Sequence, residues 1–235
     1  MTMKQYSILL LDADDTVFDF GAAEHRAFFE TMKWAGISAD AEMHRTYSAI
    51  NDRHWKALER GEMTRQQVLR GRYAEFLAHY GIEGDPYAIN QHYLTALSAC
   101  DILFDDSMDA LAQLAKGRRL YFVTNGNAMV QRGRFSKSPV MRYIDDYFIS
   151  GEIGYEKPDI RYFEAVFPRI PDFDPAQTLL VGDSPTSDLA GAIRAGLDSC
   201  YVNRRGKALP PHITPTYQVP DLASLVELLG KEVDA

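Results

Sequence analysis

The sequence predicts an α/β protein built on a doubly wound parallel sheet, with an all-helical block inserted after the first strand. Two observations predict the sheet: short apolar segments end abruptly in polar residues, and helical patterns separate these segments along the chain. Strands that alternate with helices form parallel sheets with right-handed crossovers. A third observation predicts the inserted block, because residues 20–99 contain helical patterns and helix caps without a convincing strand.

The core elements are predicted in chain order from their apolar runs and stop signals. The first strand, residues 6–11, is apolar for most of its length, as a strand buried on both faces must be. Gly117 and Gly196 are typical of helix ends. The other predicted strands are residues 120–124, 147–149, 178–181 and 200–202, and the predicted helices are residues 108–116, 160–167, 188–195 and 223–229. The proline-rich residues 212–220 are predicted to form a surface loop before the last helix.

The inserted block shows the periodicity and the caps of amphipathic helices. Apolar residues recur on one helical face over residues 43–58. Thr64 and Gln67 have the spacing of a capping box, and further along an aspartate followed by a proline is typical of a helix start. We therefore predict a core domain made of residues 1–19 and 100–235, and a helical cap made of residues 20–99.

Composition limits the partners and the location of the protein. Its 235 residues include 25 Lys and Arg against 33 Asp and Glu, which gives a net charge of −8. This sign disfavours nucleic acid or an anionic membrane as a main partner, and no apolar run approaches the roughly 18 residues that span a bilayer. The two cysteines, Cys100 and Cys200, lie far apart, which favours buried thiols over disulfides or a zinc site. We predict a cytoplasmic protein that binds neither nucleic acid nor membranes.

Polar side chains follow the most apolar predicted strands and indicate one common site. The carboxyl ends of parallel strands share an edge of the sheet, where open α/β folds bind ligands. Several carboxylates at one edge need a cation, and Mg²⁺ prefers oxygen ligands of this kind. The candidate residues, in chain order, are Asp12, Asp14, Thr124, Asn125, Lys157, Asp183 and Asp188.

These residue types suit the transfer of a phosphate group. An aspartate is a known nucleophile in phosphoryl transfer, and a second carboxylate can donate and later remove a proton. Asp12 and Asp14 could divide this work if the chain bends after Asp12. Thr124, Asn125 and Lys157 would hold the remaining phosphate oxygens. The sequence therefore predicts a Mg²⁺-dependent enzyme that acts on a small phosphorylated metabolite.

The motifs also occur in the order typical of a known family. They are residues 12–16 (DADDT), 124–126 (TNG), 157–158 (KP) and 182–188 (GDSPTSD). They resemble the four motifs of the haloacid dehalogenase-like (HAD) hydrolase superfamily, and the helical insert resembles its C1-type cap. The resemblance covers essentially the whole chain and implies a Rossmann-like core.

This resemblance implies a role for each matching residue. Asp12 is expected to be the nucleophile and Asp14 the general acid and base. Thr124 and Lys157 are expected to bind phosphate, and Lys157 also steadies Asp12. The expected metal ligands are Asp12, the backbone carbonyl of Asp14, and Asp183, with support from Asp188, for which helix capping is the alternative. Asp15 departs from the family pattern, in which many members have glycine, and it is expected to face outward.

The resemblance narrows the reaction and the substrate further. Dehalogenases of the superfamily generally lack an acid at the position of Asp14, so Asp14 favours phosphate-ester hydrolysis. Cap residues that include Asn51, Trp55 and Arg72 resemble those of bacterial pyrimidine 5′-nucleotidases of the house-cleaning type. This implies a 5′-nucleotidase for (deoxy)pyrimidine or non-standard nucleoside monophosphates, with these three residues as candidates for specificity. Core packing of Trp55 and a solvated helix face for Asn51 and Arg72 are the alternatives.

Two other functions fit the same motifs. The chain could be a HAD phosphatase or phosphomutase for phosphosugars or another small phosphorylated metabolite. It could also be a non-catalytic phosphate-accepting signalling module, since receiver domains use similar residues, although a large cap disfavours the open face of a receiver. Both a monomer and a homodimer remain open.

Overall fold

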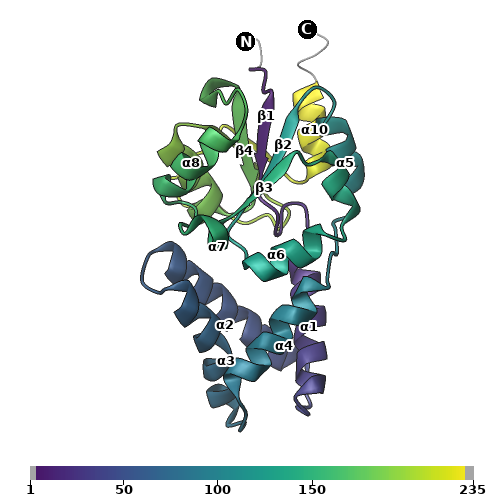
Figure 1. Ribbon diagram of the computed structural model, residues 1–235, viewed down its shortest axis with the longest axis vertical. Coiled ribbons are helices and arrows are strands. Elements are labelled where there is room, and N and C mark those ends of the chain that lie inside the picture. The colour runs from purple at the N-terminus through teal and green to yellow at the C-terminus, as the bar shows by residue number, and fades with distance from the viewer. Residues whose placement is uncertain (1–3, 231–235) are drawn as a thin grey trace.

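The computed structural model describes residues 4–230, and within them it contains a six-stranded parallel sheet (Figure 1). The strands are β1 Ile8–Leu11, β2 Arg119–Thr124, β3 Asp146–Ile149, β4 Thr178–Gly182, β5 Asp198–Val202 and β6 Tyr217–Val219. Their order in the sheet is β3-β2-β1-β4-β5-β6. The chain therefore adds strands first on one side of β1 and then on the other, which confirms the predicted doubly wound, Rossmann-like fold.

The register brings the carboxyl ends of the central strands level with one another. Leu11 at the end of β1 pairs with Phe122 in β2 and with Val181 in β4. Asp12 continues this alignment, because its backbone N–H donates to the Val181 carbonyl at 2.8 Å. Residues that follow these three strands consequently meet at one edge of the sheet.

Helices cover both faces of the sheet, and this explains why its strands are so apolar. The helices are α5 Ser107–Leu114 and α10 Leu222–Gly230 on one face, and α8 Ile160–Val166 and α9 Ala190–Ala195 on the other. In β1, Leu9 and Leu11 pack in the first cluster while Ile8 and Leu10 pack in the second, and all four are fully buried. Short 3₁₀ helices at η1 Pro139–Tyr143, η2 Phe167–Arg169 and η3 Pro175–Gln177 connect these elements.

Four helices form a block beyond the carboxyl edge of the sheet (Figure 1). They are α1 Phe20–Trp34, α2 Ala41–Glu59, α3 Arg65–Tyr80 and α4 Pro86–Ser98. The expected capping box is present at the start of α3, where Thr64 and Gln67 each bond the other's backbone N–H. The block has its own apolar core, in which Phe28 packs against Tyr47 and Phe76. The division into a core of residues 1–19 and 100–235 and a cap of residues 20–99 stays a prediction.

Two further helices, α6 Ala128–Phe135 and α7 Ser150–Ile153, lie between the sheet and the helical block (Figure 1). Two local predictions are wrong. The predicted loop contains the edge strand β6, which the prolines permit because they lie outside its three residues. The helix expected from residue 188 instead begins earlier, as the π-helix η4 Pro185–Leu189, and continues as α9.

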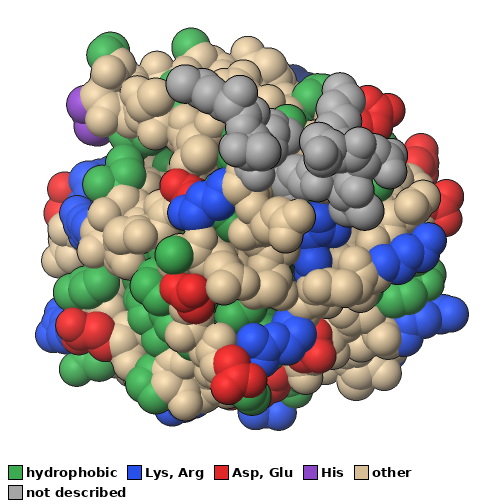
Figure 2. All heavy atoms as spheres, turned by 90° about the horizontal axis from the view of Figure 1, so that it is seen from above, with side chains coloured by type: hydrophobic (Ala, Val, Ile, Leu, Met, Phe, Trp, Pro, Cys, Tyr) green, Lys and Arg blue, Asp and Glu red, His purple; other side chains and the backbone are tan. Residues whose placement is uncertain are grey.

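The end of the molecule opposite the helical block carries charges of both signs. Seen from above, acidic and basic side chains are interspersed on this face (Figure 2). A mixed surface of this kind does not create the one-signed field that attracts a polyanion. Among residues 4–230, no helix is long and apolar enough to cross a membrane.

Candidate active site

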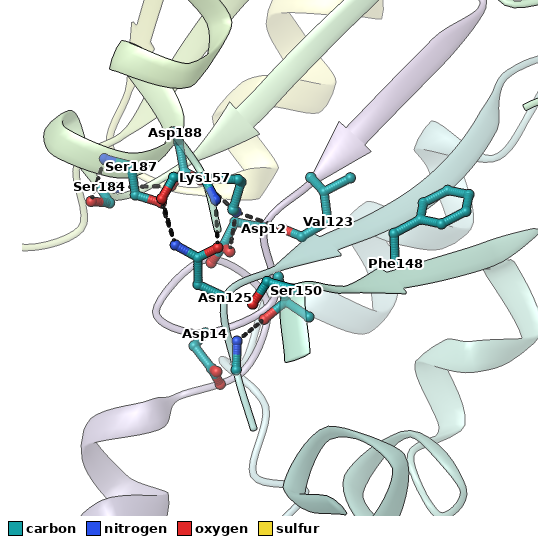
Figure 3. A network of polar contacts seen from close by, with 12 residues as sticks. Asp12, Asp14, Val123, Asn125, Phe148, Ser150, Lys157, Ser184, Ser187 and Asp188 are labelled. Carbon is teal, nitrogen blue, oxygen red and sulfur yellow. Dashed lines mark hydrogen bonds and ion pairs between the residues drawn. The ribbon is translucent and has the colours of Figure 1, made fainter. Parts of the chain in front are cut away.

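Asp12 lies at the carboxyl end of the central strand, at the point where the strand order changes direction. Its side chain is buried. The chain then leaves the strand geometry: Asp15 has a φ of 57°, and its N–H donates to the Phe18 carbonyl at 2.8 Å. The bend expected after Asp12 is therefore present, and the side chains of Asp12 and Asp14 point in different directions (Figure 3).

Lys157 is fully buried and bonds two carboxylates at once. Its ammonium donates to Asp12 Oδ1 and to Asp188 Oδ1, both at 2.7 Å (Figure 3). It also donates to the Val123 carbonyl at 2.5 Å. All three N–H groups of the ammonium therefore have protein acceptors. Its single positive charge cannot neutralise both carboxylates.

Three carboxylates come together beside this lysine. Asp12, Asp183 and Asp188 each place one oxygen within 4.8 Å of the others. Asp188 reaches this position because Gly182 has no side chain: a Cβ there would lie 2.2 Å from an Asp188 carboxylate oxygen. Carboxylate oxygens suit a hard divalent cation, so the residues present fit a Mg²⁺ site. Asp188, expected only to support the metal, lies within this cluster.

Burial and mutual repulsion raise the pKa values of two of these carboxyls, Asp12 and Asp183. Burial raises the pKa of Asp12 from 3.8 to about 8 despite the opposing charge of Lys157, and Asp188 and Asp14 raise it further. Burial also raises the pKa of Asp183 well above its usual value, with smaller contributions from Asp12 and Asp188. A divalent cation bound here would favour the ionised forms of Asp12 and Asp183.

In protein stripped of divalent ions, the contribution of this cluster to the free energy of unfolding is expected to fall as the pH rises towards about 9. The folded chain binds more protons than the unfolded chain between pH 3.8 and about 8, so the contribution of Asp12 is complete below 3.8 and is lost as the pH rises through about 8. Mg²⁺ should therefore stabilise the protein more at about pH 9 than at about pH 6. Thermal melts at both pH values, with Mg²⁺ and with chelator, check this. A Mg²⁺ effect that is larger at the lower pH would contradict it.

Thr124 and Asn125 stand beside Asp12 but use their side chains differently. The buried Thr124 hydroxyl accepts from Gln131 Nε2 at 2.9 Å and from the Gly126 N–H at 3.1 Å, which leaves its own proton to donate. The Asn125 amide donates to the Lys157 carbonyl and accepts from the Lys157 N–H, both at 2.8 Å. The Asn125 amide also donates to the Ser187 hydroxyl at 3.3 Å, so this side chain fixes the backbone of Lys157 and uses both of its N–H groups within the protein. The phosphate-binding roles of Thr124, Asn125 and Lys157 stay predictions.

A cavity of about 730 Å³ extends from the sheet edge to the helical block. This volume is typical of pockets for small organic ligands. Among the residues that line it are Asp12, Asp14, Thr124 and Asp183 on the sheet side, and Glu24, Asn51, Trp55 and Arg72 on the block side. Asp15 also lines the cavity and pairs with Arg205 at 3.0 Å, so the expectation that it faces outward is wrong.

The block side of the cavity is organised by a buried chain of polar contacts. Glu24, which is 5% exposed, accepts from Asn51 Nδ2 at 2.8 Å and from the Ser48 hydroxyl. Arg72 donates to Asn51 Oδ1 at 3.0 Å and to Asn90 Oδ1 at 2.9 Å. Since Asn51 and Arg72 are both buried, the solvated helix face considered for them is wrong.

Contacts also join the helical block to the loops around the site. Arg65, at the start of α3, donates to the Gly126 carbonyl at 3.1 Å and to the Ser150 hydroxyl at 2.6 Å. Glu59, at the end of α2, accepts from the Thr186 hydroxyl at 2.7 Å. The block therefore bonds the segments that follow β2, β3 and β4.

Sequence reasoning did not single out Glu24 or Arg134 as site residues. The missed signal for Glu24 is its place on the buried face of α1, four residues before Phe28 and seven before Thr31. Arg134 belongs to the site because it bonds Asp14. The Asp14 Oδ1 accepts from Arg134 Nη1, and its Oδ2 accepts from Gln131 Nε2 at 2.8 Å. Nothing in the local pattern of α6 indicates these two bonds.

The fold and the site together define an α/β enzyme whose buried carboxylates and lysine meet at the switch point of a parallel sheet. The chain belongs to the haloacid dehalogenase-like hydrolase family, which it matches over residues 6–196. This confirms the predicted superfamily and the predicted enzyme class, a hydrolase.

Relatives match nearly the full length of the chain. HAD-hydrolase YfnB of Bacillus subtilis (strain 168) is 38% identical over 230 residues, with 98% of each chain covered. Its solved structure, bound to magnesium, superposes with a TM-score of 0.92 over 96% of this chain and 99% of that chain. The pyrimidine 5′-nucleotidases PynA of Streptococcus pneumoniae (strain ATCC BAA-255 / R6) and YjjG of Escherichia coli (strain K12) are 31% and 28% identical. These two matches cover 97% of both chains for PynA, and 95% of this chain and 97% of YjjG.

Proposed function

We propose that the chain is a Mg²⁺-dependent phosphomonoesterase that works through an aspartyl phosphate and acts on (deoxy)pyrimidine or non-standard nucleoside 5′-monophosphates. The observation that carries this proposal is the cluster of Asp12, Asp183 and Asp188 around buried Lys157 at the cavity wall. It combines a carboxylate nucleophile with oxygen ligands for a cation. Kinship with PynA and YjjG supports the nucleotide substrate.

The reaction runs in two steps. First, an Asp12 carboxylate oxygen attacks phosphorus while the bond from phosphorus to the 5′-oxygen breaks, and Asp14 in its acid form gives its proton to that oxygen. The nucleoside leaves as an alcohol. Second, Asp14 takes a proton from water, whose oxygen attacks phosphorus and releases inorganic phosphate and the Asp12 carboxylate. Thr124 and nearby backbone N–H groups bind the phosphate oxygens in both steps.

Asp12, Asp183 and the backbone carbonyl of Asp14 would hold the Mg²⁺, with Asp188 in support. When bound, the ion would supply positive charge that offsets the repulsion between the anionic phosphate and the attacking carboxylate. Lys157 keeps one Asp12 oxygen fixed by its hydrogen bond and leaves the other oxygen for attack. The magnesium in the structure of the relative YfnB supports this choice of ion.

Phosphate release from a substrate panel tests the proposal. The panel contains pyrimidine and purine nucleoside monophosphates, phosphosugars and p-nitrophenyl phosphate, each with Mg²⁺ and with chelator. We expect Mg²⁺-dependent release with the highest kcat/KM for pyrimidine nucleotides. A preference for phosphosugars, or an isomer formed with little free phosphate, would establish the metabolite phosphatase or the phosphomutase instead. No release from any ester would favour the non-catalytic phosphate-accepting module, which the hydrolase family disfavours.

Glu24 is expected to bind the base of the nucleotide through hydrogen bonds. It is a buried acid on the block side of the cavity that takes no part in either step, and burial raises its pKa. Its remaining lone pairs can accept from an N–H or amino group of a pyrimidine. We expect Glu24→Gln to raise the KM for pyrimidine nucleotides about 10-fold or more, while the KM for p-nitrophenyl phosphate changes less than about 3-fold. Steady-state kinetics check this.

The matched control is Glu30→Gln, because Glu30 lies on the same helix and is exposed. It should leave both KM values unchanged. Equal KM values for Glu24→Gln and the unaltered enzyme with pyrimidine nucleotides would remove Glu24 from base recognition.

We also propose that the protein is cytoplasmic and is a monomer or a homodimer. Only two buried free cysteines are present, which suits a reducing compartment. Cell fractionation tests the location, and light scattering of the purified protein measures its mass in solution.

A further inference from the structure

Arg134 is a fully buried charge that neither reaction step uses. It lies near the end of α6, and its exposed fraction is 0%. Its Nη1 donates to Asp14 Oδ1 and, at 3.2 Å, to Gln131 Oε1, while its Nε donates to the Cys100 carbonyl at 3.0 Å. Burying a guanidinium costs desolvation free energy unless its hydrogen-bond partners compensate that cost. The burial of Arg134 therefore indicates that its contacts have a specific role.

Gln131, one helical turn earlier, holds the other oxygen of the same carboxylate. Its Nε2 donates to Asp14 Oδ2 at 2.8 Å and to Thr124 Oγ1 at 2.9 Å. Its side chain fills the space beside Gly126, where a Cβ would lie 2.4 Å from Nε2. Two side chains of α6 thus fix the direction of the Asp14 carboxylate at the cavity wall.

Arg134 also contacts both segments that connect the sheet to the helical block. Its guanidinium carbon lies 4.5 Å from the centre of the Phe18 ring, just before α1, and its Nε bonds Cys100, just after α4. The two segments run side by side, because the Asp19 N–H donates to the Ile102 carbonyl at 3.0 Å. One side chain therefore touches Asp14 and both connections.

We propose that Arg134, together with Gln131, is a positioning residue for Asp14. The pair fixes the orientation of the carboxyl that protonates the leaving oxygen, and Arg134 links that carboxyl to both segments that connect the sheet to the helical block. This inference rests on the proposed function, in which Asp14 is the proton donor. Arg134 itself meets neither substrate nor reacting atoms. Its loss should therefore slow the step in which the leaving oxygen needs a proton, and leave phosphate binding largely intact.

Esters with different leaving groups separate this role from a structural one. The test compares kcat/KM for a nucleoside monophosphate, whose alkoxide needs a proton, with kcat/KM for p-nitrophenyl phosphate, whose phenolate leaves without one. The value of kcat/KM depends only on the steps up to departure of the alcohol, so hydrolysis of the aspartyl phosphate does not affect it. We expect Arg134→Met to lose about 100-fold with the nucleotide and less than about 10-fold with the aryl ester. Arg134→Lys should recover part of the nucleotide loss.

Two further variants complete the design. Gln131→Met removes one bond to Asp14 without removing a buried charge, so it keeps the test valid where Arg134→Met folds poorly, and it should show a smaller loss of the same kind. Arg132→Met is the matched control, because Arg132 is exposed on the same helix and pairs with Glu152 at 2.5 Å. Arg132→Met should leave kcat/KM unchanged for both esters.

The possible outcomes are distinct. Equal losses with both esters, or no loss with either, would overturn the positioning role alone. An unaltered enzyme that releases phosphate from neither ester would overturn the proposed function and this inference with it. A loss confined largely to the nucleotide, recovered in part by lysine, supports the role.

Discussion

Replacing Asp12 by asparagine is expected to lower kcat for every phosphate ester by at least about 10⁴-fold, because an amide cannot act as the nucleophile. The variant should stay folded. Asparagine keeps an oxygen that can accept the Lys157 hydrogen bond, and it removes a carboxyl whose ionisation burial opposes. Phosphate release and thermal melting, measured beside the unaltered enzyme, check both parts.

The matched control is Asp15→Asn. Asp15 lines the same cavity three residues later, but its carboxylate pairs with Arg205 and lies outside the cluster around Lys157. This variant should retain most of its activity. An Asp12→Asn protein that keeps more than about 1% of the normal kcat would show that another group attacks phosphorus.

Replacing Lys157 by methionine should weaken both the fold and the reaction. Its ammonium bonds Asp12 and Asp188 in a fully buried position, so its loss leaves two carboxylates without a counter-charge. We expect the free energy of unfolding of the metal-free protein to fall by about 3 kcal/mol, and kcat to fall about 100-fold or more. Mg²⁺ should restore part of the lost stability. Urea unfolding with and without Mg²⁺ measures the first effect.

Lys4→Met provides the comparison for stability, since exposed Lys4 pairs with Asp198 at 2.5 Å on the surface. Its loss should cost less than about 1 kcal/mol. If the two lysine variants lost equal stability, Lys157 would be an ordinary ion pair rather than the centre of a buried cluster.

The sheet edge of the site could be predicted because a rule of geometry links it to the sequence. Asp12, Thr124 and Asp183 each stand at the end of an apolar strand, and parallel strands in register must bring such residues together. Capping signals such as Thr64 with Gln67 are equally local, and the structure contains that cap. The strand ends and the helix cap could therefore be predicted from patterns that span only a few neighbouring residues.

The remaining contacts depend on residues that are distant along the chain. Arg134 meets Asp14 across 120 positions, and Asn51 meets Glu24 across 27 positions, so no local spacing indicates either pair. Strand β6 was missed for a related reason. Its three residues, Tyr217–Val219, gain their conformation by pairing with β5 rather than from their own pattern.

The covalent role of Asp12 is tested most directly by trapping the enzyme during turnover. In Asp14→Asn the base for the second step is absent, so p-nitrophenyl phosphate with Mg²⁺ should let a phosphorylated enzyme accumulate. Acid quenching and peptide mass spectrometry should then find phosphate on Asp12, and none in Asp12→Asn or after chelation. Phosphate on a different residue, or an unmodified Asp12 while nitrophenol is released in a burst, would contradict the proposed mechanism.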